Sequence, residues 1–190
     1  MTDPAVKVEV EPILTARLSL ESMSATYLKA LLLDDVDTAT RDMGAITPMW
    51  LAKEMKHFAM YRLGQLTVDP TIQHWLGRGM VFVDEEGQRR VIGSIGFHGP
   101  PDEAGWLEIG YSIDPPYRRR GFAREAAKAM YDWAYFTHGI TKFIAAIRPD
   151  NEPSLILAAE HGYKKIGEQM DEVDGLEYVF EMFWPPAPSA

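Results

Sequence analysis

One stretch near the middle of the chain, from Trp106 to His138, constrains the fold more than any other. An apolar, strand-like run at residues 106–113 leads into a proline turn at 114–117, a basic loop at 118–123 and then a helical pattern. The first N–H groups of a helix lack intrahelical partners, and the helix macrodipole favours negative charge there. The sequence therefore predicts an anion-binding loop between a strand and a helix.

The composition of this loop indicates which anion it binds. Gly121 can adopt a positive φ and lets a ligand approach the backbone, while three arginines supply charge for phosphate oxygens. The mononucleotide loop, Gly-x-x-x-x-Gly-Lys-Ser/Thr, and the dinucleotide loop, Gly-x-Gly-x-x-Gly, are both missing at this place. A solvated charged turn is the alternative, because arginines are usually surface residues. The loop residues are Arg118, Arg119, Arg120, Gly121, Phe122 and Ala123.

The pattern Arg118-x-x-Gly121-x-Ala123 stands in an ordered set of further signals. These are Glu108-Ile-Gly-Tyr111, Asn151-Glu-Pro-Ser154 and His161-Gly-Tyr163. The set resembles the GNAT acetyltransferases, and within them the RimJ/RimL-type branch. The resemblance is firm from about Val91 to Gln169. It implies an N-acetyltransferase with acetyl-CoA as co-substrate, on a mixed α/β fold: a central mixed sheet of about seven strands, flanked by helices, with a splayed central parallel pair.

The resemblance also assigns coenzyme-binding residues. The loop backbone would bind the pyrophosphate. The backbone of Tyr111, Ser112 and Ile113 would hold the pantetheine arm and polarise the thioester carbonyl, and Pro115 and Pro116 help the strands to separate there, because proline cannot donate to a ladder.

Asn151 and Ser154 match the family's Asn-x-x-Ser, whose side chains lie beside the coenzyme. The serine can protonate the departing thiolate. A helix cap explains the asparagine almost as well. Many GNAT enzymes place a catalytic tyrosine seven residues after this asparagine, and Ala158 stands there. The acid role therefore passes to Ser154 or to water.

Glu108 is a carboxylate in an otherwise apolar strand. The acceptor amine is mostly protonated at neutral pH, with a pKa of about 8 for an α-amino group and about 10.4 for lysine. A base must therefore remove a proton before the nitrogen attacks, and a buried glutamate can do so directly or through water. The alternatives are a structural carboxylate satisfied by a partner, and bulk water as the base.

Length and patterning predict one domain over residues 1–190, with a core at 14–184 and frayed ends. A first strand is expected at 15–21, helices from Ser24 and over 48–66, and a short helix at 71–75. Further strands are expected at 80–83, 90–97, 142–147, 163–169 and 176–183, with helices closed by Gly139 and Gly162. The segment 34–47 mixes charged and turn residues.

Charge and composition exclude several classes. The formal net charge of −9 disfavours a nucleic-acid binder, and the five histidines show no metal spacing. No apolar run is long enough for a membrane span or signal peptide, and cysteine is absent, so we expect a cytoplasmic protein with no membrane partner. Without cysteine, direct attack of the amine in a ternary complex is expected.

The acceptor stays open between a protein N-terminus, a lysine, a small amine and an antibiotic. An acidic surface suits a cationic acceptor. A homodimer is also open, since an exposed last strand could pair between subunits. The alternative function is a catalytically silent acyl-CoA-binding module.

Overall fold

The computed structural model describes residues 8–186, and these form two compact units. The first contains the described part of Met1–Gly96 together with Tyr111–Ala129, and the second contains Phe97–Gly110 with the described part of Met130–Ala190. Residues 1–7 and 187–190, on which the predicted frayed ends mostly fall, lie outside the described residues.

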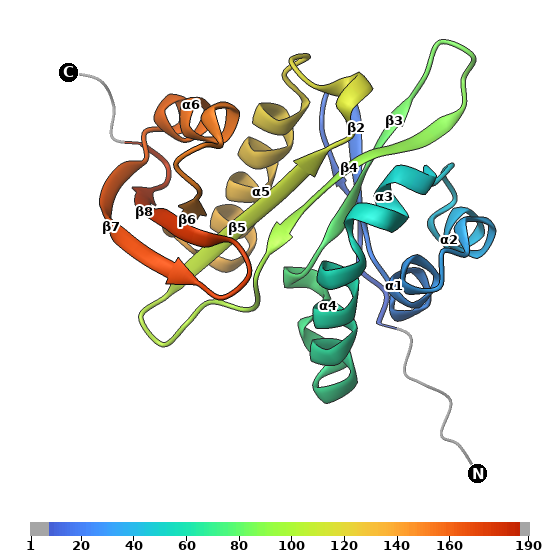
Figure 1. Cartoon of the computed structure of the whole chain (residues 1–190), viewed down its shortest axis with the longest axis horizontal. Coiled ribbons are helices and arrows are strands. Elements are labelled where there is room, and N and C mark those ends of the chain that lie inside the picture. Colours follow the sequence, from blue (N-terminus) through green and yellow to red (C-terminus); the bar gives the residue numbers. More distant parts are fainter. Residues whose placement is uncertain (1–7, 187–190) are drawn as a thin grey trace. The chain divides into compact units, whose positions relative to one another are not determined.

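The first unit contains an antiparallel sheet with the order β1-β2-β3-β4. Alternating apolar residues fix its register, because Leu18 and Leu20 of the second strand are buried opposite Phe82 and Met80. The strands, shown in blue to green in Figure 1, are β1 (Ile13–Leu14), β2 (Leu18–Ser22), β3 (Arg78–Val83) and β4 (Arg89–Phe97).

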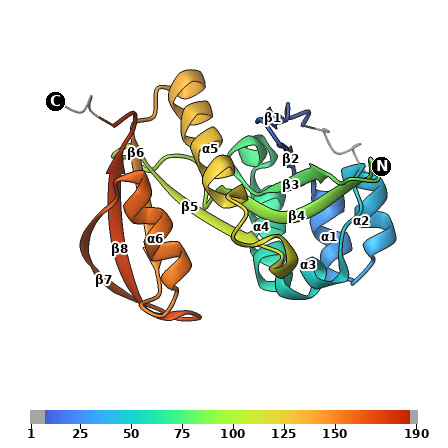
Figure 2. The same cartoon turned by 90° about the horizontal axis from the view of Figure 1, so that it is seen from above.

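Helices supply the rest of the apolar core of this unit (Figure 2). The first begins at the predicted cap, where the Ser24 hydroxyl accepts from the Tyr27 N–H at 3.0 Å. The segment 34–47, which mixes charged and turn residues, contains a helix that Asp35 caps and Gly44 ends at a φ of 64°. The expected helix over 48–66 is two helices that meet at Met55. The elements are α1 (Ala25–Leu32), α2 (Val36–Met43), α3 (Met49–Glu54), α4 (Lys56–Val68) and the 3₁₀ helix η1 (Pro70–Trp75).

The β3 strand presents different side chains to its two faces. Val81 and, on β4, Val91 are buried in the core formed with helices α1–α4. The next residue, Phe82, points to the opposite face, where its ring lies 5.2 Å from that of Phe122. The start of the long helix after the basic loop is therefore anchored on the sheet by an aromatic contact.

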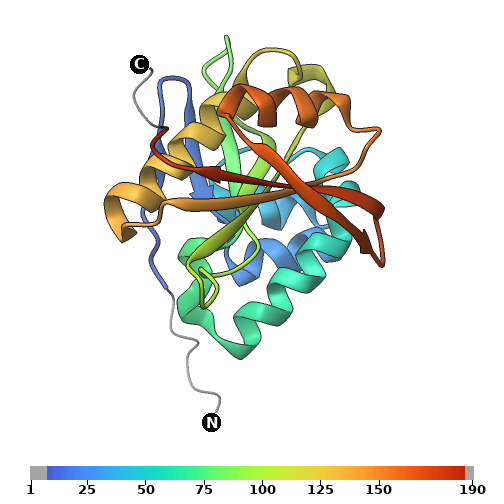
Figure 3. The same cartoon turned by 90° about the vertical axis from the view of Figure 1, so that its left-hand side faces the viewer.

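The second unit contains the sheet order β5-β6-β8-β7 (Figure 3). The predicted parallel pair is confirmed: Trp106–Glu108 pair in register with Lys142–Ile144, and among the described pairs the register covers only the first three residues of each strand. The remaining elements are β5 (Trp106–Ile113), η2 (Pro115–Tyr117), α5 (Phe122–His138), β6 (Lys142–Ile147), α6 (Glu152–His161), β7 (Lys164–Asp171) and β8 (Gly175–Phe183).

Aromatic packing around Tyr131 forms the core of the second unit. Its buried ring lies 4.8 Å from Phe143 and 5.5 Å from Trp184, and its hydroxyl lies 3.2 Å from that of Tyr163. The hydrogen bond satisfies two polar groups that would otherwise cost free energy when buried. This cluster joins α5 and β6 to the residues just before β7 and just after β8.

The mixed α/β class is confirmed, with eight strands in the described residues against about seven expected. The additional strand is β1, which has only two residues. The single-domain organisation stays a prediction.

Candidate active site

The end of β5 and the proline turn come together in the first unit. Asp114 donates its N–H to the carbonyl of Ile92 at 2.9 Å, and its carboxyl is buried, which raises its pKa against the opposing effect of Arg118. A Cβ on Gly93 would lie 2.3 Å from the Ser112 carbonyl oxygen, so only glycine fits beside the strand there. The backbone of Tyr111–Ile113 is thus tightly held.

The structure gives the three arginines of the loop different environments. The Nε of Arg118 donates to the Ile113 carbonyl at 2.8 Å, which uses one of the backbone groups predicted to hold pantetheine. The guanidinium of Arg120 lies 5.2–5.7 Å from the ring centroids of Phe82, Tyr117 and Phe122.

Arg119 differs from its two neighbours. It has a left-handed φ of 60°, and within the described residues its side chain has no hydrogen-bond or ion-pair partner and contacts no aromatic ring. A left-handed backbone costs a non-glycine residue about 1–2 kcal/mol. As far as the described residues go, an anion that binds the Arg119 guanidinium therefore has no existing contact of that side chain to displace.

Gly121 has the positive φ that the sequence predicts, at 78°. Helix α5 begins at the next residue: Phe122 is buried and Ala123 is half-buried in its first turn. A bent, glycine-containing loop that ends at a helix N-terminus directs several N–H groups toward one place. The geometry suits a phosphate or pyrophosphate group.

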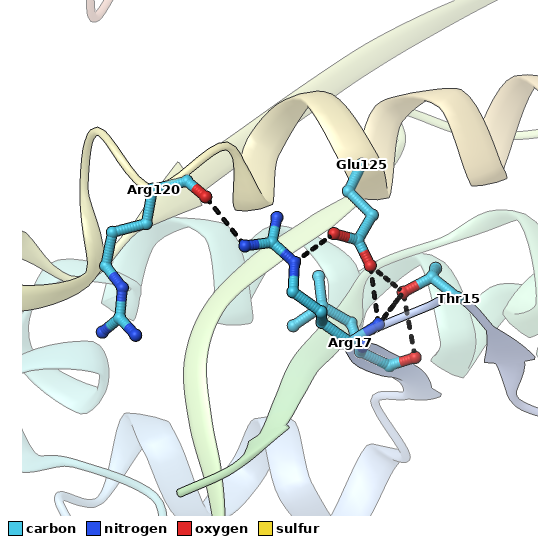
Figure 4. Close-up of polar contacts among 5 residues, drawn as sticks. Thr15, Arg17, Arg120 and Glu125 are labelled. Atoms are coloured by element: carbon cyan, nitrogen blue, oxygen red, sulfur yellow. Dashed lines mark hydrogen bonds and ion pairs between the residues drawn. The ribbon is translucent and has the colours of Figure 1, made fainter.

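A contact that the sequence does not reveal ties this loop to the segment between β1 and β2 (Figure 4). The Nε of Arg17 lies 2.6 Å from Glu125 Oε2, and its Nη1 donates to the Arg120 carbonyl at 2.9 Å. The Arg17 N–H and the Thr15 hydroxyl both donate to Glu125 Oε1, at 2.8 and 2.6 Å. Burial would raise the pKa of Glu125, but the hydrogen bonds from Thr15 and Arg17 outweigh it and lower that pKa.

Glu108 lies in the second unit beside a histidine. Its Oε1 is 3.3 Å from Nδ1 of His98, and the His98 N–H donates to the Glu108 carbonyl at 2.9 Å. A Cβ on Gly110 would lie 2.9 Å from His98 Nε2, so the glycine makes room for the ring. The sequence analysis considers a buried glutamate as the base, whereas Glu108 is half-buried, with 36% of its side chain exposed. A partly exposed carboxylate can exchange protons with water.

Asn151 and Ser154 are brought together at the start of α6. Asn151 Oδ1 accepts from the Ser154 N–H at 3.3 Å, so the helix-cap interpretation of the asparagine holds. Ser154 is half-buried, and among the described contacts Glu108 and Ser154 share no hydrogen bond. The coenzyme roles of both α6 residues stay predictions.

Residues 8–186 contain no group of three or more histidine, aspartate or glutamate side chains that could hold a metal ion. None of their helices is long and apolar enough to cross a membrane.

A family model described as an acetyltransferase (GNAT) domain matches residues 17–164. The N-acetyltransferase p20 of Bacillus licheniformis is 26% identical over 158 residues, covering 83% of this chain and 85% of that protein. The N-acetyltransferase YjdG of Bacillus subtilis is 32% identical over 77 residues, 40% of this chain, and this chain spans less than half of YjdG, 43%.

Solved structures share the fold at low identity. The RimL ribosomal L7/L12 alpha-N-protein acetyltransferase, in complex with coenzyme A, aligns with a TM-score of 0.61 and 14% identity, over 91% of this chain and 98% of that chain. The match to the GNAT family model begins at Arg17, whose side chain contacts the basic loop, and it includes the loop itself.

Proposed function

The chain belongs to the GNAT acetyltransferase family, and from this premise we propose that it transfers the acetyl group of acetyl-CoA to a primary amine by direct attack in a ternary complex. The observation that carries the proposal is the loop before α5, with left-handed backbone at Arg119 and Gly121 and an Arg119 guanidinium that has no partner in the part of the chain that the structure describes. A pyrophosphate fits this combination of backbone N–H groups and positive charge. RimL, which shares the fold, is described with bound coenzyme A.

The coenzyme supplies an activated acetyl group as a thioester. The neutral amine nitrogen forms a bond to the carbonyl carbon, the carbon–sulfur bond breaks, and coenzyme A leaves as a thiolate that takes up a proton. Glu108 accepts the proton that the amine loses, and its partly exposed side chain can pass that proton to water. Ser154 donates its hydroxyl proton to the thiolate and takes up a proton from water in the same step, so that the serine stays neutral. The demand on this acid is mild, since thiol pKa values lie near 8.5.

His98 has a supporting role in this scheme. Its ring, 3.3 Å from the Glu108 carboxylate, holds that carboxylate in one orientation. Gly110 keeps space for the ring, and a side chain there would push the ring away.

The acceptor is a protein N-terminus or a small-molecule amine. RimL is described as an alpha-N-protein acetyltransferase, which makes an N-terminal peptide one acceptor to test. The net charge of −9 favours association with a cationic acceptor.

A panel of amines tests the proposal, with N-terminal peptides, lysine peptides, polyamines and aminoglycosides incubated with acetyl-CoA and release of the coenzyme A thiol measured. Thiol release that depends on one class of amine is expected. Coenzyme binding without release on any amine would instead indicate a silent acyl-CoA-binding module. No binding of acetyl-CoA would contradict both functions.

A further inference from the structure

Arg17 makes contacts that are unusual for an exposed arginine. It precedes β2, yet its guanidinium reaches the Arg120 carbonyl, 103 positions later in the sequence, at 2.9 Å. The same group pairs with Glu125 and lies 4.4 Å from the centroid of the Phe122 ring. One side chain thus contacts the basic loop and the first turn of α5 together (Figure 4).

The bond to the Arg120 carbonyl has a consequence for the next amide. In a trans peptide the C=O and the following N–H point in opposite directions. Arg17 holds the Arg120 oxygen toward itself, so the Gly121 N–H is directed away from Arg17. That N–H belongs to the group of amides that the loop offers to an anion.

The loop also needs support from outside. Arg119 and Gly121 both have positive φ, and a left-handed non-glycine residue persists only where its surroundings hold it. A single exposed ion pair is worth little. Here both oxygens of Glu125 are engaged, by the Arg17 Nε, the Arg17 N–H and the Thr15 hydroxyl. The combined contacts leave the start of α5 little freedom to rotate.

We propose that Arg17 is a positioning residue for the coenzyme, which fixes the Arg120–Gly121 peptide in the orientation that presents the Gly121 N–H to the pyrophosphate. The inference rests on the proposed function. Glu125 and Thr15 hold Arg17 in place, and Arg17 itself does not touch the reacting atoms.

The test uses Arg17→Met, which keeps most of the stem and removes the donors, and two thioesters. Acetyl-CoA contains the pyrophosphate, whereas S-acetyl-pantetheine lacks it. With acetyl-CoA, KM should rise roughly 10- to 100-fold while kcat changes little, because a displaced binding group weakens binding steeply. With S-acetyl-pantetheine, kcat/KM should be unchanged. Arg41→Met, the same substitution at an exposed arginine of α2, is the matched control and should leave both values unchanged.

Arg17→Lys keeps the charge but cannot engage Glu125 and the Arg120 carbonyl with one planar group, so partial recovery of KM is expected. This variant also serves if Arg17→Met does not fold. An unchanged KM for acetyl-CoA in the variants would overturn the inference, and so would an equal loss with both thioesters, which indicates general damage to the fold. Failure of the wild-type protein to bind acetyl-CoA would instead overturn the proposed function, and the inference with it.

Discussion

The two units of this protein differ in what they offer to the reaction. The first contains a bent basic loop whose conformation is held by Arg17 and Glu125. The second contains the Glu108–His98 pair and the capped start of α6. Fixed backbone and charge suit binding of the coenzyme, whereas a half-buried carboxylate beside an imidazole suits proton transfer. Substitutions in the first unit should therefore change coenzyme affinity, and those in the second should change turnover.

The largest effect is expected in the second unit. Glu108→Gln should lower kcat by roughly 10²- to 10⁴-fold and leave the Kd for acetyl-CoA nearly unchanged, because the amide cannot accept the amine proton. The loss should shrink as the pH rises, since the amine then arrives neutral. Steady-state rates from pH 6 to 10 check this, with Glu103→Gln in an exposed loop of the same unit as control. Full activity across the range would show that Glu108 is structural.

A pair of glycines sharpens the comparison in the first unit. Gly121 and Gly87 have almost the same φ, 78° and 77°, and Gly87 lies in the β3–β4 turn. Alanine at either position should destabilise the protein by about 1–2 kcal/mol, from left-handed strain. Only Gly121→Ala should also raise the Kd for acetyl-CoA, by about tenfold, because it disturbs the loop. Calorimetric titration of both variants tests this, and equal affinities would place the coenzyme elsewhere.

Local sequence patterns predict the parts of the site that depend on neighbouring residues. The Asn151 cap, the left-handed Gly121 and the apolar strand at Trp106–Ile113 all follow from a few adjacent positions. The sequence analysis does not predict the α2 helix, because its eight residues are mostly polar. Its recognisable signals lie at its two ends, where Asp35 caps it and Gly44 ends it.

Long-range contacts could not be predicted in this way. The pairs Arg17–Glu125 and His98–Glu108 join different elements, and no spacing along the chain encodes them. The different environments of Arg118, Arg119 and Arg120 likewise depend on the Ile113 carbonyl and on the aromatic rings that the fold places nearby.

A smaller effect is expected at α6. Ser154→Ala should lower kcat only a few-fold, and high pH should not rescue it, because a thiolate with a pKa near 8.5 can take its proton from water. Asn151→Ala should cost about 0.5–2 kcal/mol of stability through loss of the cap. Urea unfolding and steady-state rates separate these effects. A loss in Ser154→Ala as large as that in Glu108→Gln would contradict this division of roles.

The smallest effect concerns Glu125 in the first unit. Its pKa is lowered in the folded state, so its contribution to stability is present above its ordinary pKa of 4.5 and is lost as the pH falls through the lowered value. The stability difference between the wild type and Glu125→Gln should therefore be largest near pH 7 and vanish in acid. It should stay below about 1 kcal/mol, since Arg17 is exposed to solvent. A difference that grows in acid, in urea midpoints from pH 3 to 7, would contradict the assigned pairing.

Thermal unfolding with and without acetyl-CoA tests the central claim, that the loop before α5 belongs to a coenzyme-binding acetyltransferase. A ligand at one hundred times its Kd adds about 2.7 kcal/mol, which for a chain of this size raises Tm by roughly 5–11 °C. We expect that shift in the wild type and a reduced shift in Gly121→Ala at the same concentration. A wild-type Tm that does not move at millimolar acetyl-CoA would contradict the claim.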